Sequence, residues 1–145
     1  MHYLRHGNVQ DLRQEISLKT EQTIETKKLA QRIALLCKSK KAVKVTVLDL
    51  QKVGGFCDYF VIAGVNSLRQ GSALSDSIQD DLAKDAIKPL FHGPASDESG
   101  WVVLDYVSVI VHIFYKPVRE FYALEKLWAD AKKIRIPAKL SKNKD

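Results

Sequence analysis

The stretch that decides the fold is YFVIAGVNSLRQ, residues 59–70. Its first part, Tyr59–Ala63, is an uninterrupted apolar run of strand length, which indicates a buried central strand. The segment from Gly64 to Asn66 then turns the chain. Ser67, followed three residues later by Gln70, is a capping box and predicts that a helix begins here. A buried strand that leads into a helix is the first half of a crossover to a parallel strand.

Similar elements are expected upstream of this stretch. Valines alternate with polar residues over positions 43–47, which predicts a strand with one buried face. Before it we expect a helix that is capped by Thr20 and ends in the cluster Lys38–Lys41, where cations suit a helix C-terminus. Its apolar residues recur at helical spacing. They are Leu29, Ile33 and Leu36.

Downstream, the helix that opens at Ser67 carries leucine and isoleucine on one face, at four-residue steps. Three more strands are expected after it. They are Leu90–His92, Trp101–Leu104 and Val109–Tyr115. The link Asp105–Ser108 is short enough to make the last two a hairpin. Pro117 suits the first turn of a final helix, which we expect to continue to Trp128.

This order of elements predicts an α/β fold, with a five-stranded mixed sheet flanked by helices. The helix after Ser67 gives one parallel connection, and the short links give antiparallel neighbours. A length of 145 residues fits one domain. We expect residues 1–22 to be an N-terminal extension of uncertain structure, residues 23–131 to form the domain, and residues 132–145 to be a basic C-terminal tail.

Charge and cysteine content narrow the class of protein. The net charge is +6, but residues 131–145 hold six cations against Asp145, so the rest of the chain is nearly neutral. A basic tail can meet phosphates without sequence specificity. The longest apolar runs are too short to span a bilayer, and residues 1–20 lack the apolar core of a secretory signal. We expect a cytoplasmic protein that does not bind membranes, with Cys37 and Cys57 as free thiols.

Three blocks of sequence resemble the ribosomal silencing factors, also called the RsfS or Iojap-related family. The first runs from Asp58 to Ala63 and continues with Ser67–Gln70. The second is Gly100–Tyr106 leading into Val109–Phe114, and the third is Arg119–Trp128. They occur in the family's order and spacing, so that residues 23–131 resemble an RsfS/Iojap domain.

The resemblance implies a sheet related to the nucleotidyltransferase fold. It also implies a function without catalysis or cofactor. Family members bind ribosomal large-subunit protein fourteen and sterically prevent the small subunit from joining, which represses translation when nutrients are scarce. Many members are dimeric, so we expect a homodimer, and the basic tail could add a minor contact to ribosomal RNA.

The resemblance also assigns residues. Those expected to bind the partner are Trp101, Asp105, Tyr106, Ser108 and His112. Those expected to carry the structure of the family motif are Asp58, Tyr59, Ser67, Arg69, Gln70, Arg119, Tyr122, Leu124, Glu125 and Trp128. The chain departs from the family at Val107-Ser108, where Gly-Asp is usual, and at Cys57, where threonine is usual. The first departure removes a residue suited to positive φ and a negative charge.

Two other functions find less support in the sequence. A nucleotidyltransferase needs paired strand aspartates that hold magnesium, but Asp80-Asp81 and Gly71-Ser72 fall inside an expected helix. An RNA-binding protein could act through the basic tail, but the chain lacks the aromatic residues interleaved with basic ones that single-strand binders use. A metal site is not expected, because His112 has no second or third ligand at a suitable spacing.

Overall fold

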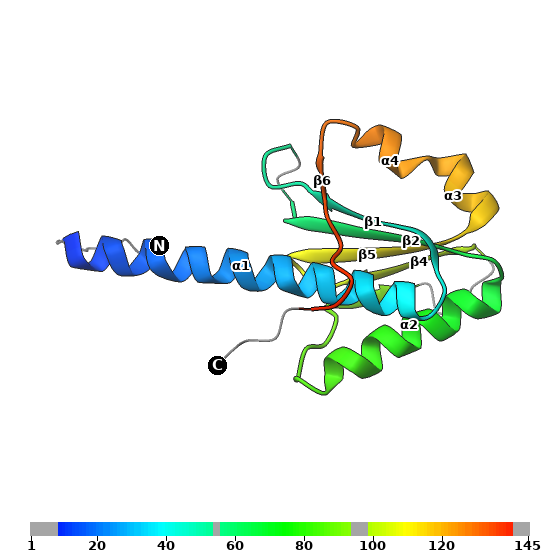
Figure 1. Ribbon diagram of the computed structural model, residues 1–145, viewed down its shortest axis with the longest axis horizontal. Helices are drawn as coiled ribbons and strands as arrows, with labels where there is room; N and C mark the ends of the chain where they lie inside the picture. The colour runs from blue at the N-terminus through cyan, green and yellow to red at the C-terminus, as the bar shows by residue number, and fades with distance from the viewer. Residues whose placement is uncertain (1–8, 54–55, 94–98, 141–145) are drawn as a thin grey trace.

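Six strands form one mixed sheet in the computed structural model, which describes residues 9–53, 56–93 and 99–140 (Figure 1). The strands are β1 (Val43–Asp49), β2 (Tyr59–Val65), β3 (Phe91–Gly93), β4 (Trp101–Asp105), β5 (Val109–Tyr115) and β6 (Lys132–Ile134). Their order across the sheet is β3-β4-β5-β2-β1-β6. The helices are α1 (Val9–Ser39), α2 (Leu68–Ala83), α3 (Lys116–Tyr122) and α4 (Leu124–Leu127). The chain is thus an α/β fold, as the sequence predicts.

The prediction of five strands is wrong, because residues 132–134 of the expected tail form β6. This strand pairs antiparallel with β1, with Ile134 opposite Val47 and Lys132 opposite Asp49. Ile134 also packs against the main core, which gives the edge strand an apolar anchor. The basic composition of the segment concealed this strand.

The crossover predicted from residues 59–70 is confirmed. All seven residues of β2 are buried, and β2 pairs parallel with β5 over its full length. Ser67 caps α2 by accepting a hydrogen bond from the Gln70 amide at 3.0 Å. The Gln70 side chain in turn accepts from the Asn66 amide at 2.8 Å. The hairpin between β4 and β5 is also present, with Trp101 opposite Phe114 and Asp105 opposite Ile110.

Both terminal helices differ from the prediction. Thr20 does not cap the first helix, since α1 runs unbroken from Val9 to Ser39. The final helix is split, because Ala123 has a left-handed backbone (φ 46°) that ends α3 and precedes α4. Local propensity favours continuation here, so the break reflects tertiary contacts.

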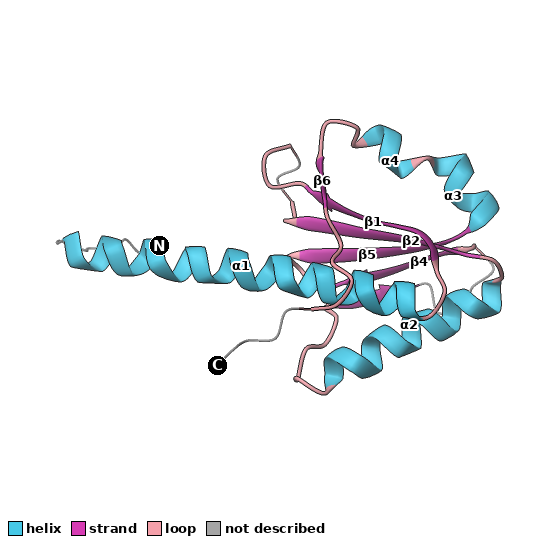
Figure 2. Cartoon of the chain, in the orientation of Figure 1, coloured by secondary structure: helices cyan, strands magenta, loops and turns pink. Residues whose placement is uncertain are grey.

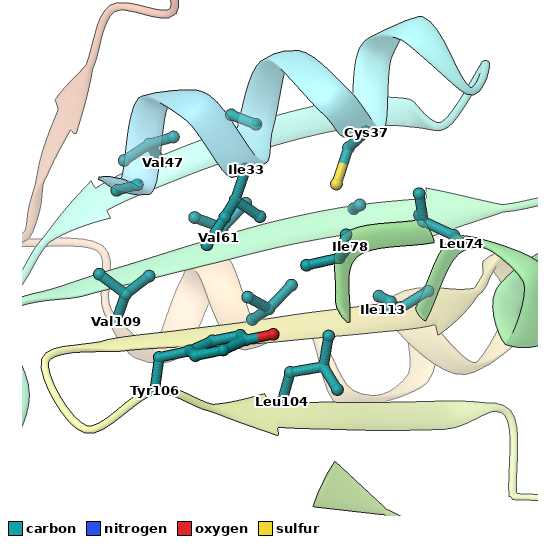
Figure 3. Packing of buried hydrophobic residues seen from close by; sticks show 14 of the residues in the cluster. Ile33, Cys37, Val47, Val61, Leu74, Ile78, Leu104, Tyr106, Val109 and Ile113 are labelled. Atoms are coloured by element: carbon teal, nitrogen blue, oxygen red, sulfur yellow. The ribbon is translucent and has the colours of Figure 1, made fainter. Parts of the chain in front are cut away.

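The sheet has a different core on each side (Figure 2). Helices α1 and α2 cover the first face, where Ile33, Ile78 and Leu104 belong to the main cluster (Figure 3). Helices α3 and α4 lie over the second face, where Phe60, Phe114 and Leu124 belong to a smaller cluster. The chain then crosses α1 after β6, so that residues 135–140 lie against the outside of that helix (Figure 1). Within the described ranges, no helix is long and apolar enough to cross a membrane.

Candidate functional site

The second face of the sheet is only partly covered over β4. Side chains of this strand alternate strictly between buried and part-exposed. Val102 and Leu104 belong to the main cluster of the first face. Trp101, Val103 and Asp105 therefore point to the second face, where they are part-exposed. We call this region the open face and define it by these three residues with Ile110 and His112 of β5.

Trp101 is held in place on the open face by His112. The indole Nε1–H donates a hydrogen bond to His112 Nδ1 at 3.1 Å. The indole ring also contacts Phe114, with ring centroids 4.9 Å apart, and Phe60 packs edge-on against the His112 ring at 4.5 Å. An indole fixed by a hydrogen bond and two rings loses little conformational freedom when it meets a partner.

His112 is neutral in this setting. Burial lowers the pKa of the imidazole to about 4, so the ring carries no charge near neutral pH. Because Nδ1 accepts from Trp101, the single ring proton resides on Nε2. Nε2 is buried and has no hydrogen-bond partner among the described residues. The open face thus contains a buried N–H donor close to Trp101 that lacks an acceptor.

A row of aromatic rings extends the open face across β2. Phe56 contacts Phe60 at 5.8 Å and Trp128 at 6.0 Å, measured between ring centroids. Trp128 also meets Phe60 edge-on at 5.9 Å. Phe56 is 58% exposed, so the row reaches the surface at this end.

Several exposed apolar residues lie at the same end of the sheet, where β1 and β4 end and β2, β3 and β5 begin. We call them the apolar rim; they are Val53, Phe56, Leu90, Phe91 and Val107. No sequence motif singles out Phe56 or Phe91. Phe56 follows a Gly-Gly pair outside the three motif blocks, and only the pairing of Phe91 with Asp105 places it on the face of Trp101.

The predicted partner-binding residues do not all lie on the open face. Trp101, His112 and Asp105 do, whereas Tyr106 is 7% exposed and packs in the main cluster of the first face (Figure 3). Burial raises the pKa of the Tyr106 phenol to about 12, and its hydroxyl has no partner within the described part of the chain. Ser108 lies in the turn, where its carbonyl accepts hydrogen bonds from the amides of Asp58 and Tyr59.

The turn between β4 and β5 has the backbone that the family's glycine would suit. Val107 adopts φ 73°, a left-handed conformation that is costly for a β-branched residue. The Asp105 carboxylate accepts a hydrogen bond from the Val107 amide at 2.7 Å. Asp105 therefore stabilises the turn as well as facing the open side.

Arg119 joins α3 and α4 to the sheet. It is 7% exposed, and its Nε donates to Glu125 Oε2 at 2.8 Å while Nη2 makes a second bond to the same oxygen. Nη1 donates to the Val43 carbonyl at 3.3 Å, which ties the pair to β1. Burial opposes ionisation of Glu125, but the hydrogen bond and charge of Arg119 outweigh it and lower the pKa of that carboxyl.

The other residues of the predicted family motif occupy structural positions. Tyr59 and Leu124 are buried, Asp58 and Trp128 are part-exposed, and Arg69 is exposed on the first turn of α2. Gln70 is part-exposed, and its amide also lies within hydrogen-bond distance of the Lys40 and Lys41 carbonyls, which links α2 to the end of α1. The side chain of Tyr122 lies outside the described residues.

The described residues that could bind a metal or take part in catalysis do not gather in one site. In residues 9–53, 56–93 and 99–140, no three His, Cys, Asp or Glu side chains lie close enough to hold a metal. Cys37 and Cys57 are buried free thiols, and burial is the main cause that raises each pKa to about 12. The Asp80-Asp81 pair lies on α2, where Asp81 accepts from Arg32 at 3.0 Å.

Comparison with known proteins identifies relatives of this chain in sequence and in fold. Residues 23–145 match the family model described as "Ribosomal silencing factor during starvation". The chain is 37% identical over 98 residues to ribosomal silencing factor RsfS of Bacillus subtilis, covering 68% of this chain and 82% of that protein. It is 29% identical to the chloroplastic protein Iojap of Arabidopsis thaliana, over 78% of this chain and 47% of the plant protein. A crystal structure of a Chromobacterium violaceum protein superposes with a TM-score of 0.63 and 28% identity, covering 77% of this chain and 89% of that one.

Proposed function

Because this chain belongs to the family of ribosomal silencing factors, which are non-enzymatic ribosome regulators, we propose that its open face docks on the large ribosomal subunit. The partner on the subunit is ribosomal large-subunit protein fourteen. Occupation of that site sterically excludes the small subunit and so represses translation. The protein acts by filling space at an interface, with no bond made or broken.

The observation that carries this proposal is the fixed, part-exposed indole of Trp101. Tryptophan is enriched among the residues that dominate binding energy, especially where it is surrounded by packed neighbours. Here the ring is held by His112 and flanked by Phe114 before any partner arrives. Binding then costs little ordering entropy.

The other assigned residues contribute in two ways under this proposal. Asp105 is part-exposed and offers an acceptor beside the indole, whereas His112 is buried and acts by orienting Trp101. Tyr106 and Ser108 support the open face indirectly. Tyr106 packs in the main cluster, and the Ser108 carbonyl anchors the turn to β2. The serine at position 108 leaves this turn without the charge that the family's Gly-Asp supplies.

A pull-down with purified large subunits tests the proposal. Trp101→Ala should weaken binding by about thirtyfold, the consequence of losing roughly 2 kcal/mol at a central tryptophan. Leu12→Ala is the matched control, since Leu12 is 51% exposed on the remote part of α1. In a sucrose-gradient assay, excess wild-type protein should keep subunits apart. Normal joining in its presence would reject the proposal.

Further parts of the function rest on the same premise. The apolar rim supports a homodimer, because exposed large apolar residues at one end of a sheet are typical of interaction sites. We propose that residues 23–131 form the ribosome-binding domain, with residues 1–22 as an extension and residues 132–145 as a basic tail whose first residues join the sheet. We also propose that the protein works in the cytoplasm. The kinship of its sheet with the nucleotidyltransferase fold stays a prediction.

A further inference from the structure

Two basic segments that are far apart in the sequence lie side by side in the fold. The chain after β6 crosses the outside of α1, and the Gln31 side chain donates a hydrogen bond to the Arg135 carbonyl at 3.1 Å (Figure 1). Ile136 packs against the main cluster and holds the crossing in place. The basic composition of the C-terminal segment therefore adds to that of α1 on one surface.

The cations gathered there are exposed and share one side of the helix. Lys27, Gln31 and Lys38 are spaced by four and seven residues, which places them along one stripe of α1. We call the whole patch the strap surface; its cations are Lys27, Lys28, Lys38, Arg135 and Lys139, all exposed. In the described part of the chain, none of these five takes part in an ion pair.

The two acids of α2 that face α1 are already neutralised. Arg32 forms ion pairs with Asp81 at 3.0 Å and with Asp85 at 2.8 Å, which ties α1 to α2. An open groove of about 880 Å³ lies between Arg32, with its ion-pair partner Asp81, and the crossing segment. Its lining includes Lys38 and Lys139. The free lysines therefore face a concave space with no unpaired carboxylate in its lining.

We propose that the strap surface binds the phosphate backbone of an RNA duplex. Five exposed cations, of which Lys38 and Lys139 line the groove, match a polyanion, and such contacts need no sequence readout. The surface carries no aromatic residue on which unpaired bases could stack, which favours a duplex over a single strand. It also lacks the Trp or Phe side chains that anchor basic helices in a lipid interface.

This inference deepens the proposed function, on which it rests for the identity of the RNA. The strap surface lies on the α1 side of the sheet, and the open face lies on the other side. A protein seated on a ribosomal protein through one side can therefore touch a neighbouring ribosomal RNA helix through the opposite side. The two contacts use no residue in common.

Fluorescence anisotropy with a labelled RNA duplex tests the proposal. The duplex has about 16 base pairs, the length that small domains for double-stranded RNA contact. The double variant Lys38→Gln and Lys139→Gln should weaken binding by roughly tenfold at low salt, and the slope of log K against log salt should become shallower by about 1.5. The matched control is Lys52→Gln with Lys116→Gln, which removes the same charge from exposed sites on other elements.

Each outcome of this experiment either supports the proposal or overturns it. Weak duplex binding in the first variant with wild-type binding in the control supports the strap surface. Equal weakening in both variants, no duplex binding by the wild type, or tighter binding to phosphatidylserine vesicles or polyglutamate than to RNA overturns it. Binding to isolated ribosomal large-subunit protein fourteen is measured in parallel. There Trp101→Ala should lose affinity and the lysine variant should not, so failure of the docking proposal is distinguishable from failure of this one.

Discussion

At the scale of single residues, the protein combines a strongly coupled polar pair on each side of its aromatic row. The Trp101–His112 hydrogen bond orients an indole at the surface, and the Arg119–Glu125 pair fastens the helices that cover the rest of that face. His112 and Arg119 are buried while their partners are part-exposed, and His112 and Glu125 are the members whose pKa values shift. A fall in pH should therefore destabilise the second face of the sheet before the first.

The first prediction concerns His112 and pH. Its pKa is lowered from 6.5 to about 4 in the folded protein, so the unfolded chain binds the extra proton first. The stabilising effect of the neutral ring is complete above pH 6.5 and is lost as pH falls toward 4. Denaturant unfolding of the wild type should show this decline. His112→Gln, which cannot titrate, should show a flatter profile; identical profiles would contradict the burial of a neutral ring.

The second prediction concerns the part-buried ion pair. Arg119→Ala leaves Glu125 without its partner and removes the bond to the Val43 carbonyl, and should destabilise the fold by about 1–3 kcal/mol, measured by urea unfolding. The lowered pKa of Glu125 means that the pair stabilises the protein above the ordinary glutamate pKa and loses this effect as pH falls through the folded value. Lys116→Ala, an exposed cation at the start of α3, is the control and should leave stability nearly unchanged.

The sequence predicted part of the site at this scale. Strand alternation correctly places His112 on the face opposite to Val111 and Ile113. The same rule predicts Tyr106 on the face of Leu104, inside the core, whereas its place at the hairpin end and the family resemblance favour a partner contact. The link between Trp101 and His112 depends on strand register and rotamers, which a single sequence does not contain.

At the scale of elements, the break between α3 and α4 lets two short helices follow the curvature of the sheet. Ala123 adopts φ 46° and ψ 51°, and its amide still donates to the Arg119 carbonyl at 2.8 Å. Burial of Leu124 and the reach of Arg119 to Glu125 fix this turn. The sequence predicted one helix over 117–128, because alanine, leucine, glutamate and lysine all favour helix and the compensating contacts are tertiary.

A glycine at this position gives the third prediction. Ala123→Gly should stabilise the protein by roughly 0.5–1 kcal/mol, because glycine adopts the left-handed conformation without steric cost. Ala73→Gly on the exposed side of α2 is the control and should destabilise by about 1 kcal/mol. Thermal melts of the two variants should move in opposite directions. A drop in the melting temperature of Ala123→Gly would argue against the observed turn.

At the scale of the whole molecule, the segment that follows α4 closes the fold. It adds β6 to the sheet edge beside β1 and then crosses α1, where Gln31 bonds to the Arg135 carbonyl. Ile134 and Ile136 alternate with basic residues, which is a strand pattern three residues long. The basic composition of the region masks this short pattern, and only the tertiary structure shows that both isoleucines have a core to pack against.

The fourth prediction tests this closure. Ile136→Ala removes apolar contact between the crossing segment and the main cluster, and should cost about 1–2 kcal/mol for a part-buried side chain. Amide hydrogen exchange should rise in the second half of α1 and in β6, while β5 stays protected. Lys139→Ala, which lies on the same segment but is exposed, should leave exchange unchanged. Unchanged protection in Ile136→Ala would mean that the crossing does not restrain α1.

The parallel pairing at the centre of the sheet affects how the chain must be made. β2 is buried along its whole length, yet its neighbour β5 is separated from it by α2, β3 and β4. A polypeptide cut short before Val109 would present an apolar strand with a bare hydrogen-bonding edge, which invites other chains to add to it. A prematurely terminated chain should therefore aggregate or be degraded, and it should not yield a shorter functional protein.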